Sequence, residues 1–201
     1  MDTVQMLLAL ATQKGFEKCL CEFTLYIKKS GDEILVVSLY VDDLLVQQKQ
    51  NEIFISQQKY AKEVLKKFNM EAWKLTATPM NQKEKFLKED GAKKVDDKLY
   101  RSLIGCLMYL TATKPDIMHV ASLLSRYMNC ASEIHLQAAK RILRYVKGPV
   151  DYGIKFSQVE NFSLHGYSDS DWAGCADDMR STSGYCSGIF SWYSKKQEII
   201  A

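Results

Sequence analysis

The sequence predicts an α+β protein with strands towards both ends and helices between them. Three features point to this class: the β-branched run ILVVSLYV at residues 34–41, three- and four-residue apolar periodicity between residues 57 and 147, and a return to short alternating stretches after residue 160. With 201 residues, of which 47% are hydrophobic, the chain can form one large domain or two small ones.

Two strands are expected near the start, over residues 23–28 and 33–41, because Ser30-Gly31-Asp32 between them has turn composition. The second run is almost entirely apolar, which suits a strand covered on both faces. It ends at Asp42 and Asp43, and an apolar strand resumes at residues 44–46. Two acids therefore interrupt an otherwise buried hairpin.

Helical periodicity starts at residue 57 and runs to 68, with Tyr60, Val64, Leu65 and Phe68 on one face. Residues 81–98 mix both charges around a glycine, which is typical of a solvated linker. Further helices are expected over 99–110, 115–128 and 132–147. Pro115 suits a first helical turn, Ser132 is a good N-cap, and Gly148-Pro149 ends the last helix. The residues expected to face inward are Ile117, Val120, Leu124, Tyr127, Leu136, Ala139, Leu143 and Val146.

The last fifty residues return to strand patterns. Phe162 and Leu164 alternate with polar positions up to Tyr167, and two further strands are expected over 183–190 and 191–196.

Composition excludes several classes of protein. A net charge of +3, from 27 basic and 24 acidic side chains, is too small for a purely electrostatic nucleic-acid binder. No run of about 18 apolar residues is present, and no basic region precedes the short apolar patch at residues 6–11, so neither a membrane span nor a signal peptide is expected. The six cysteines form no C-x-x-C pair, which favours reduced thiols over zinc, and cytoplasm or nucleus if the chain is expressed.

Asp42 and Asp43 are the first candidates for chemistry. Carboxylates on a rigid hairpin can hold Mg²⁺, which prefers a few hard oxygen ligands together with substrate phosphates. Taken alone, the acid pair is more simply interpreted as an exposed polar turn.

The surrounding residues change that balance. LYVDDLL resembles the active-site hairpin of reverse transcriptases, and the stretches around it extend the likeness. In order, GFEKCLCEFTLYIKKSGDEILVVSLYVDD, IFISQQKYAKEVLKKF, YRSLIGCLMYLTATKPDIMHVASLLSRYM, HLQAAKRILRYVKG, GYSDSDWAGCADDMRSTSGYC and SWYSKKQEIIA resemble Pol polyproteins of copia-type retrotransposons. The resemblance covers nearly the whole chain after the first dozen residues.

The resemblance implies four regions: a partial reverse transcriptase palm with its following helix (1–80), a linker (81–98), a helical connection (99–150) and the N-terminal part of a ribonuclease H-like domain (151–201). It implies that Asp42 and Asp43 are polymerase ligands, and Asp169 in GYSDSDW the first nuclease ligand, for Mg²⁺ or Mn²⁺. The implied partner is an RNA/DNA template-primer; no membrane and no small-molecule cofactor are expected.

Several parts of the family pattern are missing. The polymerase needs a third acid from a separate strand, and Asp32 is unsuitable because ten residues of extended strand span roughly 30 Å. The family carries several dozen residues after LLVQQKQ that help to position the primer, and its next nuclease acid lies beyond SWYSKKQEIIA. We therefore expect a fragment that is inactive by itself, or active only if a partner chain supplies the missing acids.

The helix over 132–147 carries a basic face made of Lys140, Arg141, Arg144 and Lys147. These side chains could contact phosphates without reading sequence, giving a weak nucleic-acid-binding remnant. An ordinary solvated helix face explains them equally well.

Overall fold

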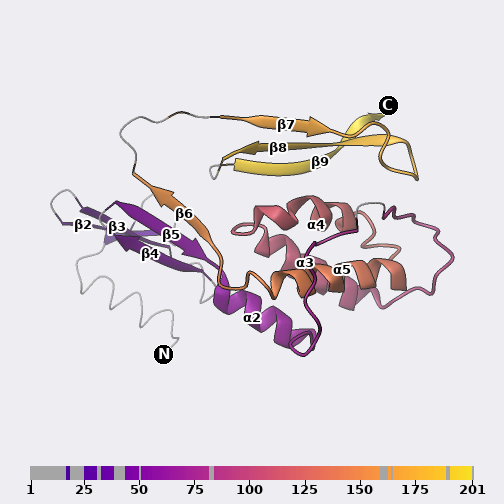
Figure 1. Cartoon of the computed structure of the whole chain (residues 1–201), viewed down its shortest axis with the longest axis horizontal. Helices are drawn as coiled ribbons and strands as arrows, with labels where there is room; N and C mark the ends of the chain where they lie inside the picture. The colour runs from indigo at the N-terminus through magenta and orange to yellow at the C-terminus, as the bar shows by residue number, and fades with distance from the viewer. Residues whose placement is uncertain are drawn as a thin grey trace.

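The computed structural model describes residues 17–18, 25–30, 33–38, 44–49, 51–81, 84–158, 163, 165–188 and 191–200. These residues form a group of helices and three antiparallel sheets of three strands each (Figure 1). The α+β class is therefore confirmed.

The first sheet has the order β1 (Glu17–Lys18), β2 (Leu25–Ser30) and β3 (Glu33–Ser38). Ser30 pairs with Glu33, which leaves a two-residue connection where the turn was predicted. Both strands expected in this region are present, with shifted ends. Asp42 and Asp43 lie outside the described residues.

The second sheet joins β4 (Leu45–Lys49), β5 (Glu52–Ser56) and β6 (Ile154–Ser157). The sequence predicted that β4 would form a hairpin with the strand before it, but in the described part of the chain β4 pairs with β5 instead. The apolar run Ile53–Ile55 is reached through a two-residue connection, so it is the nearest partner along the chain. Neither β5 nor β6 was predicted.

Four α-helices follow the expected pattern: α2 (Gln58–Lys67), α3 (Asp97–Leu110), α4 (Met118–Ser125) and α5 (Glu133–Val146). A 3-10 turn (Pro115–Ile117) precedes α4, with Pro115 at its first position. The apolar stripes of these helices meet in one core, and seven of the eight residues expected to face inward are buried, Leu136 being partly buried. We call α2–α5 with their connections the helical unit.

The segment predicted to be a solvated linker is partly built into this core. Most of its side chains are exposed, but Phe86 is buried at 4% exposure, with its ring centroid 6.2 Å from Tyr127 and 5.7 Å from His135. Tyr127 Oη also donates to the Phe86 carbonyl at 2.9 Å. One aromatic residue among many charges was too weak a signal to overturn the linker interpretation.

The third sheet has the order β7 (Tyr167–Ser170), β8 (Arg180–Ser187) and β9 (Ser191–Ile200), and β9 runs beside α4 (Figure 1). The hydrogen bonds that join it to the helical unit include Trp192 Nε1 to the Thr111 carbonyl at 3.0 Å and Ser122 Oγ to the Ser194 carbonyl at 2.9 Å. Phe162 and Leu164 lie outside the described residues. None of the described helices is both long enough and apolar enough to span a bilayer.

Candidate functional site

Asp169 lies in β7, and its side chain is exposed. It pairs with Gly184, which pairs with Ser194, so these three residues share one face of the third sheet. The Ser194 hydroxyl lies 3.3 Å from His119 Nδ1 of α4, so this face is turned towards the helical unit. Asp169 and His119 line the same cavity, of about 300 Å³.

Asp171, two residues further on, has a structural role. Its carboxylate accepts a hydrogen bond from the Thr182 main-chain N–H at 2.5 Å, and its own N–H donates to the Thr182 carbonyl at 3.1 Å. These bonds tie the loop after β7 to β8. A Cβ at Gly174 would overlap the Asp171 carboxylate, so the tight loop needs a glycine there.

These donors do not fit a two-metal nuclease centre. Within the described residues, no group of three or more His, Cys, Asp or Glu side chains could hold a metal ion. Asp169 offers one carboxylate, and the nearby Asp171 carboxylate is bound to main chain. A pair of ions needs several oxygen ligands held between the attacking and leaving groups.

The basic face of α5 is covered by the segment that follows α2 (Figure 1). We call residues 73–78 the strap. Lys147 Nζ donates to the Trp73 carbonyl at 3.0 Å, Arg144 Nε to the Lys74 carbonyl at 2.7 Å, and Arg141 Nη2 to Thr78 Oγ1 at 3.0 Å. Lys140 makes none of these contacts. Three of the four predicted phosphate-binding residues therefore already have partners within the chain.

Comparison with known proteins identifies the family. The chain is 33% and 34% identical to the retrovirus-related Pol polyproteins of transposons RE2 and RE1 of Arabidopsis thaliana, over 92% of its length. It is 35% identical to the corresponding polyprotein of transposon TNT 1-94 of Nicotiana tabacum over 74% of its length. The chain belongs to the Pol polyproteins of copia-type retrotransposons.

Within that family, the chain corresponds to a small part of a Pol polyprotein. It spans 15% of the RE1 and RE2 proteins and 12% of the TNT 1-94 protein. The alignments with RE1 and RE2 run over 223 residues, which exceeds the 201 residues of the chain, so both polyproteins contain residues with no counterpart here. No family model and no solved structure matches the chain.

The sequence analysis did not predict one buried polar cluster of this Pol segment. The Ser132 hydroxyl donates to Asp90 Oδ2 and accepts from the His135 N–H at 3.5 Å, while the Ser132 N–H donates to His135 Nδ1 at 3.1 Å. Ser132 and His135 are both 0% exposed. Serine, histidine and aspartate together suggest a nucleophilic triad, but a hydroxyl that no substrate can reach is a helix cap.

Burial lowers the pKa of His135 below its usual 6.5, and Lys94 acts in the same direction while Asp90 opposes them. Because Nδ1 accepts a hydrogen bond from the Ser132 N–H, the proton of the neutral ring is on Nε2. That atom is buried and has no partner within the described residues. The ring stacks on Tyr127 at 4.2 Å.

Proposed function

We propose that this Pol segment joins the end of a reverse transcriptase palm to the start of a ribonuclease H-like domain and has no turnover by itself. The observation that carries the proposal is the placement of Asp169 on an end strand of a three-stranded antiparallel sheet, which follows the helical unit and β6 along the chain. The order of elements is the order of the family motifs along the chain, and the Pol relatives match over the same range.

The polymerase part has only two of the acids that nucleotidyl transfer requires. Asp42 and Asp43 would bind Mg²⁺ or Mn²⁺ on a template-primer, but no third acid of the chain falls in a matching family motif. The residues that the RE1 and RE2 polyproteins carry beyond this chain support a lost primer-positioning segment. Positioning supplies much of the catalysis in phosphoryl transfer, so this loss matters as much as a missing ligand.

The nuclease part is proposed to be incomplete for the same reason. Asp169 would be the first ligand of the metal pair, and the described donors around it do not complete the set. A partner chain that supplies the missing segments would restore both activities, which makes the proposal testable by gain of function.

The experiment uses the chain alone and a chimera in which the missing RE2 segments are restored. We expect no extension of a primed RNA template and no cleavage of an RNA–DNA hybrid by the chain alone with Mg²⁺ or Mn²⁺. The chimera should do both; Asp42→Asn should abolish extension only, and Asp169→Asn cleavage only. Activity of the purified chain that disappears in either variant would overturn the proposal.

A second proposal is weak, sequence-independent phosphate binding by the basic face of α5. It is favoured by Lys140, which donates none of the hydrogen bonds that hold the strap. Four free cations would give a log–log salt slope of about −3 to −4, at roughly −0.9 for each phosphate contact. With three cations bound to the strap we expect a slope of about −1. The double variant Arg141→Ala/Arg144→Ala should then change this salt slope little. Lys140→Ala should abolish the salt dependence, and Asp42→Asn should leave the slope unchanged.

A further inference from the structure

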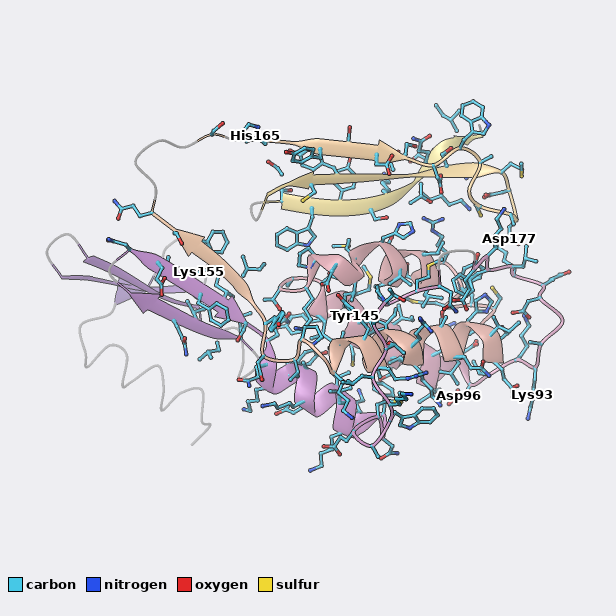
Figure 2. All side chains as sticks on the ribbon, in the orientation of Figure 1. Lys93, Asp96, Tyr145, Lys155, His165 and Asp177 are labelled. Carbon is cyan, nitrogen blue, oxygen red and sulfur yellow. The ribbon has the colours of Figure 1, made fainter. Side chains whose placement is uncertain are left out.

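A second cavity, of about 480 Å³, lies between the helical unit and the loop that joins β7 to β8. The lining includes apolar groups of Phe86, Leu123 and Tyr127, and Arg126 and Thr182 add polar groups. The Lys88 N–H donates to Asp177 Oδ1 at 3.1 Å, and this bond ties the loop, in which Figure 2 labels Asp177, to the helical unit.

Arg126 is the unusual member of this lining. It caps the C-terminal end of α4, and its Nη2 donates to Thr182 Oγ1 at 3.0 Å. Its Nη1 is buried and has no hydrogen-bond partner among the described residues. None of the ion pairs within the described part of the chain includes Arg126. A guanidinium that is partly removed from water without an anionic partner is unfavourable, because its donors lose their bonds to water.

The two carboxylates that line the same cavity are directed elsewhere. Asp171 is exposed and its Oδ1 accepts from the Thr182 N–H, while Glu84 Oε2 accepts from the Asn81 side chain at 2.9 Å. Neither makes a hydrogen bond or an ion pair with Arg126. Arg126 therefore lines the cavity without a carboxylate bonded to its guanidinium among the described residues.

We propose that this cavity binds a small organic anion, with its phosphate or carboxylate group on Arg126 and its apolar body against Phe86, Leu123 and Tyr127. A planar guanidinium is well suited to oxyanions because its parallel N–H groups match two oxygens. The volume is within the range of small-molecule sites, which combine mostly apolar walls with a few polar groups. The lining of this cavity includes neither Asp169 nor the basic face of α5, so the inference does not rest on the proposed function.

The test titrates phenyl phosphate, inorganic phosphate and phenol into the full chain, with binding followed by calorimetry and by methyl resonances. We expect saturable binding of phenyl phosphate, weaker binding of phosphate and of phenol, and shifts at Leu123 and Thr182. Arg126→Gln should weaken binding of phenyl phosphate at least about tenfold, because one charge-assisted contact is lost. Arg126→Lys should recover part of the affinity.

Arg101→Gln is the matched control, since Arg101 is an exposed arginine of α3 that contacts Asn129 and Asp97 away from the cavity. It should bind phenyl phosphate as the parent does. Absence of saturable binding, unchanged affinity in folded Arg126→Gln, or shifts confined to other methyl groups would each overturn the proposal. If Arg126→Gln does not fold, the methyl shifts of the parent chain test the proposal instead. Shifts at Leu123 and Thr182 support it, and shifts elsewhere overturn it. Displacement of phenyl phosphate by an RNA–DNA duplex at equal phosphate concentration would also overturn it, because the site would then belong to a polymer.

Discussion

The imidazole of His135 couples the stability of the helical unit to pH. Burial holds its folded-state pKa below 6.5, so the folded chain keeps the ring neutral at a pH where the unfolded chain protonates it. The stability that neutral His135 contributes is fully present above about pH 6.5. It is lost as pH falls from 6.5 towards the lower folded-state pKa, because the unfolded state then binds more protons.

We therefore predict that the free energy of unfolding decreases between pH 7.5 and 5, with His135 adding at most about 1.4 kcal/mol per pH unit. Urea unfolding at a series of pH values measures this slope. His135→Gln should be less stable at pH 7.5 but should have a flatter slope. His165→Gln is the control, since His165 is exposed outside the helical unit and should leave the slope unchanged. An identical slope in His135→Gln would contradict the assignment.

At the residue scale, sequence reasoning identified Ser132 but not its partner. Ser132 stands before an amphipathic helix, which is a local signal, and it is the N-cap of α5. Asp90 lies 42 residues earlier, in a stretch that was interpreted as a solvated linker. The Arg144 and Lys147 contacts were equally hidden, because a main-chain carbonyl can be supplied by any residue type.

The junction of β5 and β6 depends on a close approach at Gly153. A Cβ there would overlap the Ile55 carbonyl and press against Phe54 and Ser56. We predict that Gly153→Ala destabilises the chain by about 1–3 kcal/mol, because the main chain of β5 must move. Gly105→Ala is the matched change in α3, where a Cβ meets no atom within 4 Å, and it should stabilise by about 0.5–1 kcal/mol. Chemical denaturation of both variants checks the pair; equal effects would refute the packing argument.

The strap is predicted to depend on Arg141 and Arg144 of α5, which bond to it, rather than on Lys140. Arg144→Ala removes the bond to the Lys74 carbonyl and should cost about 1 kcal/mol, a modest value because the contact is exposed. Amide exchange of residues 73–78 should accelerate in Arg144→Ala through local opening, while α3 stays protected. Lys140→Ala should leave exchange in the strap unchanged. Equal acceleration of exchange in both variants would mean that the total positive charge of α5, and not the bond from Arg144 to the Lys74 carbonyl, holds the strap.

Elements were predictable where their signal is local. The four helices followed from apolar periodicity and from caps such as Pro115 and Ser132, because both depend on neighbouring residues. Strand partners were not predictable in the same way. Ile154 and Ile55 are about a hundred positions apart, and nothing in either short run specifies the other.

At the scale of the whole molecule, the third sheet is joined to the helical unit by a small number of polar contacts. We predict that Trp192→Phe, which deletes the donor to the Thr111 carbonyl, destabilises this docking by about 1 kcal/mol. Trp172→Phe is the control, since Trp172 is 85% exposed, and its effect should stay within about 0.5 kcal/mol. Thermal unfolding followed separately by amide resonances of β9 and of α3 distinguishes the two regions. Coincident, unshifted transitions in Trp192→Phe would show that this bond does not hold the docking.

The family was predictable from motifs and is confirmed by the relatives, whereas the four regions along the chain stay a prediction. The polymerase acids remain a prediction, since Asp42 and Asp43 lie outside the described residues. How the third sheet lies on α4 had no sequence signal, because the contacts of Ser122 and Trp192 use groups that also suit a solvated surface.

The pairing of Glu52 in β5 with Ser157 in β6 places the two strands that flank the helical unit side by side, about 4.8 Å apart. A segment whose ends meet can be inserted into a host protein, or lifted out of it, without forcing the flanking parts to separate. Loss of residues before Glu52 therefore changes what precedes the unit and leaves its interior intact. In evolutionary terms, this arrangement would let residues 52–157 pass between host proteins as one piece.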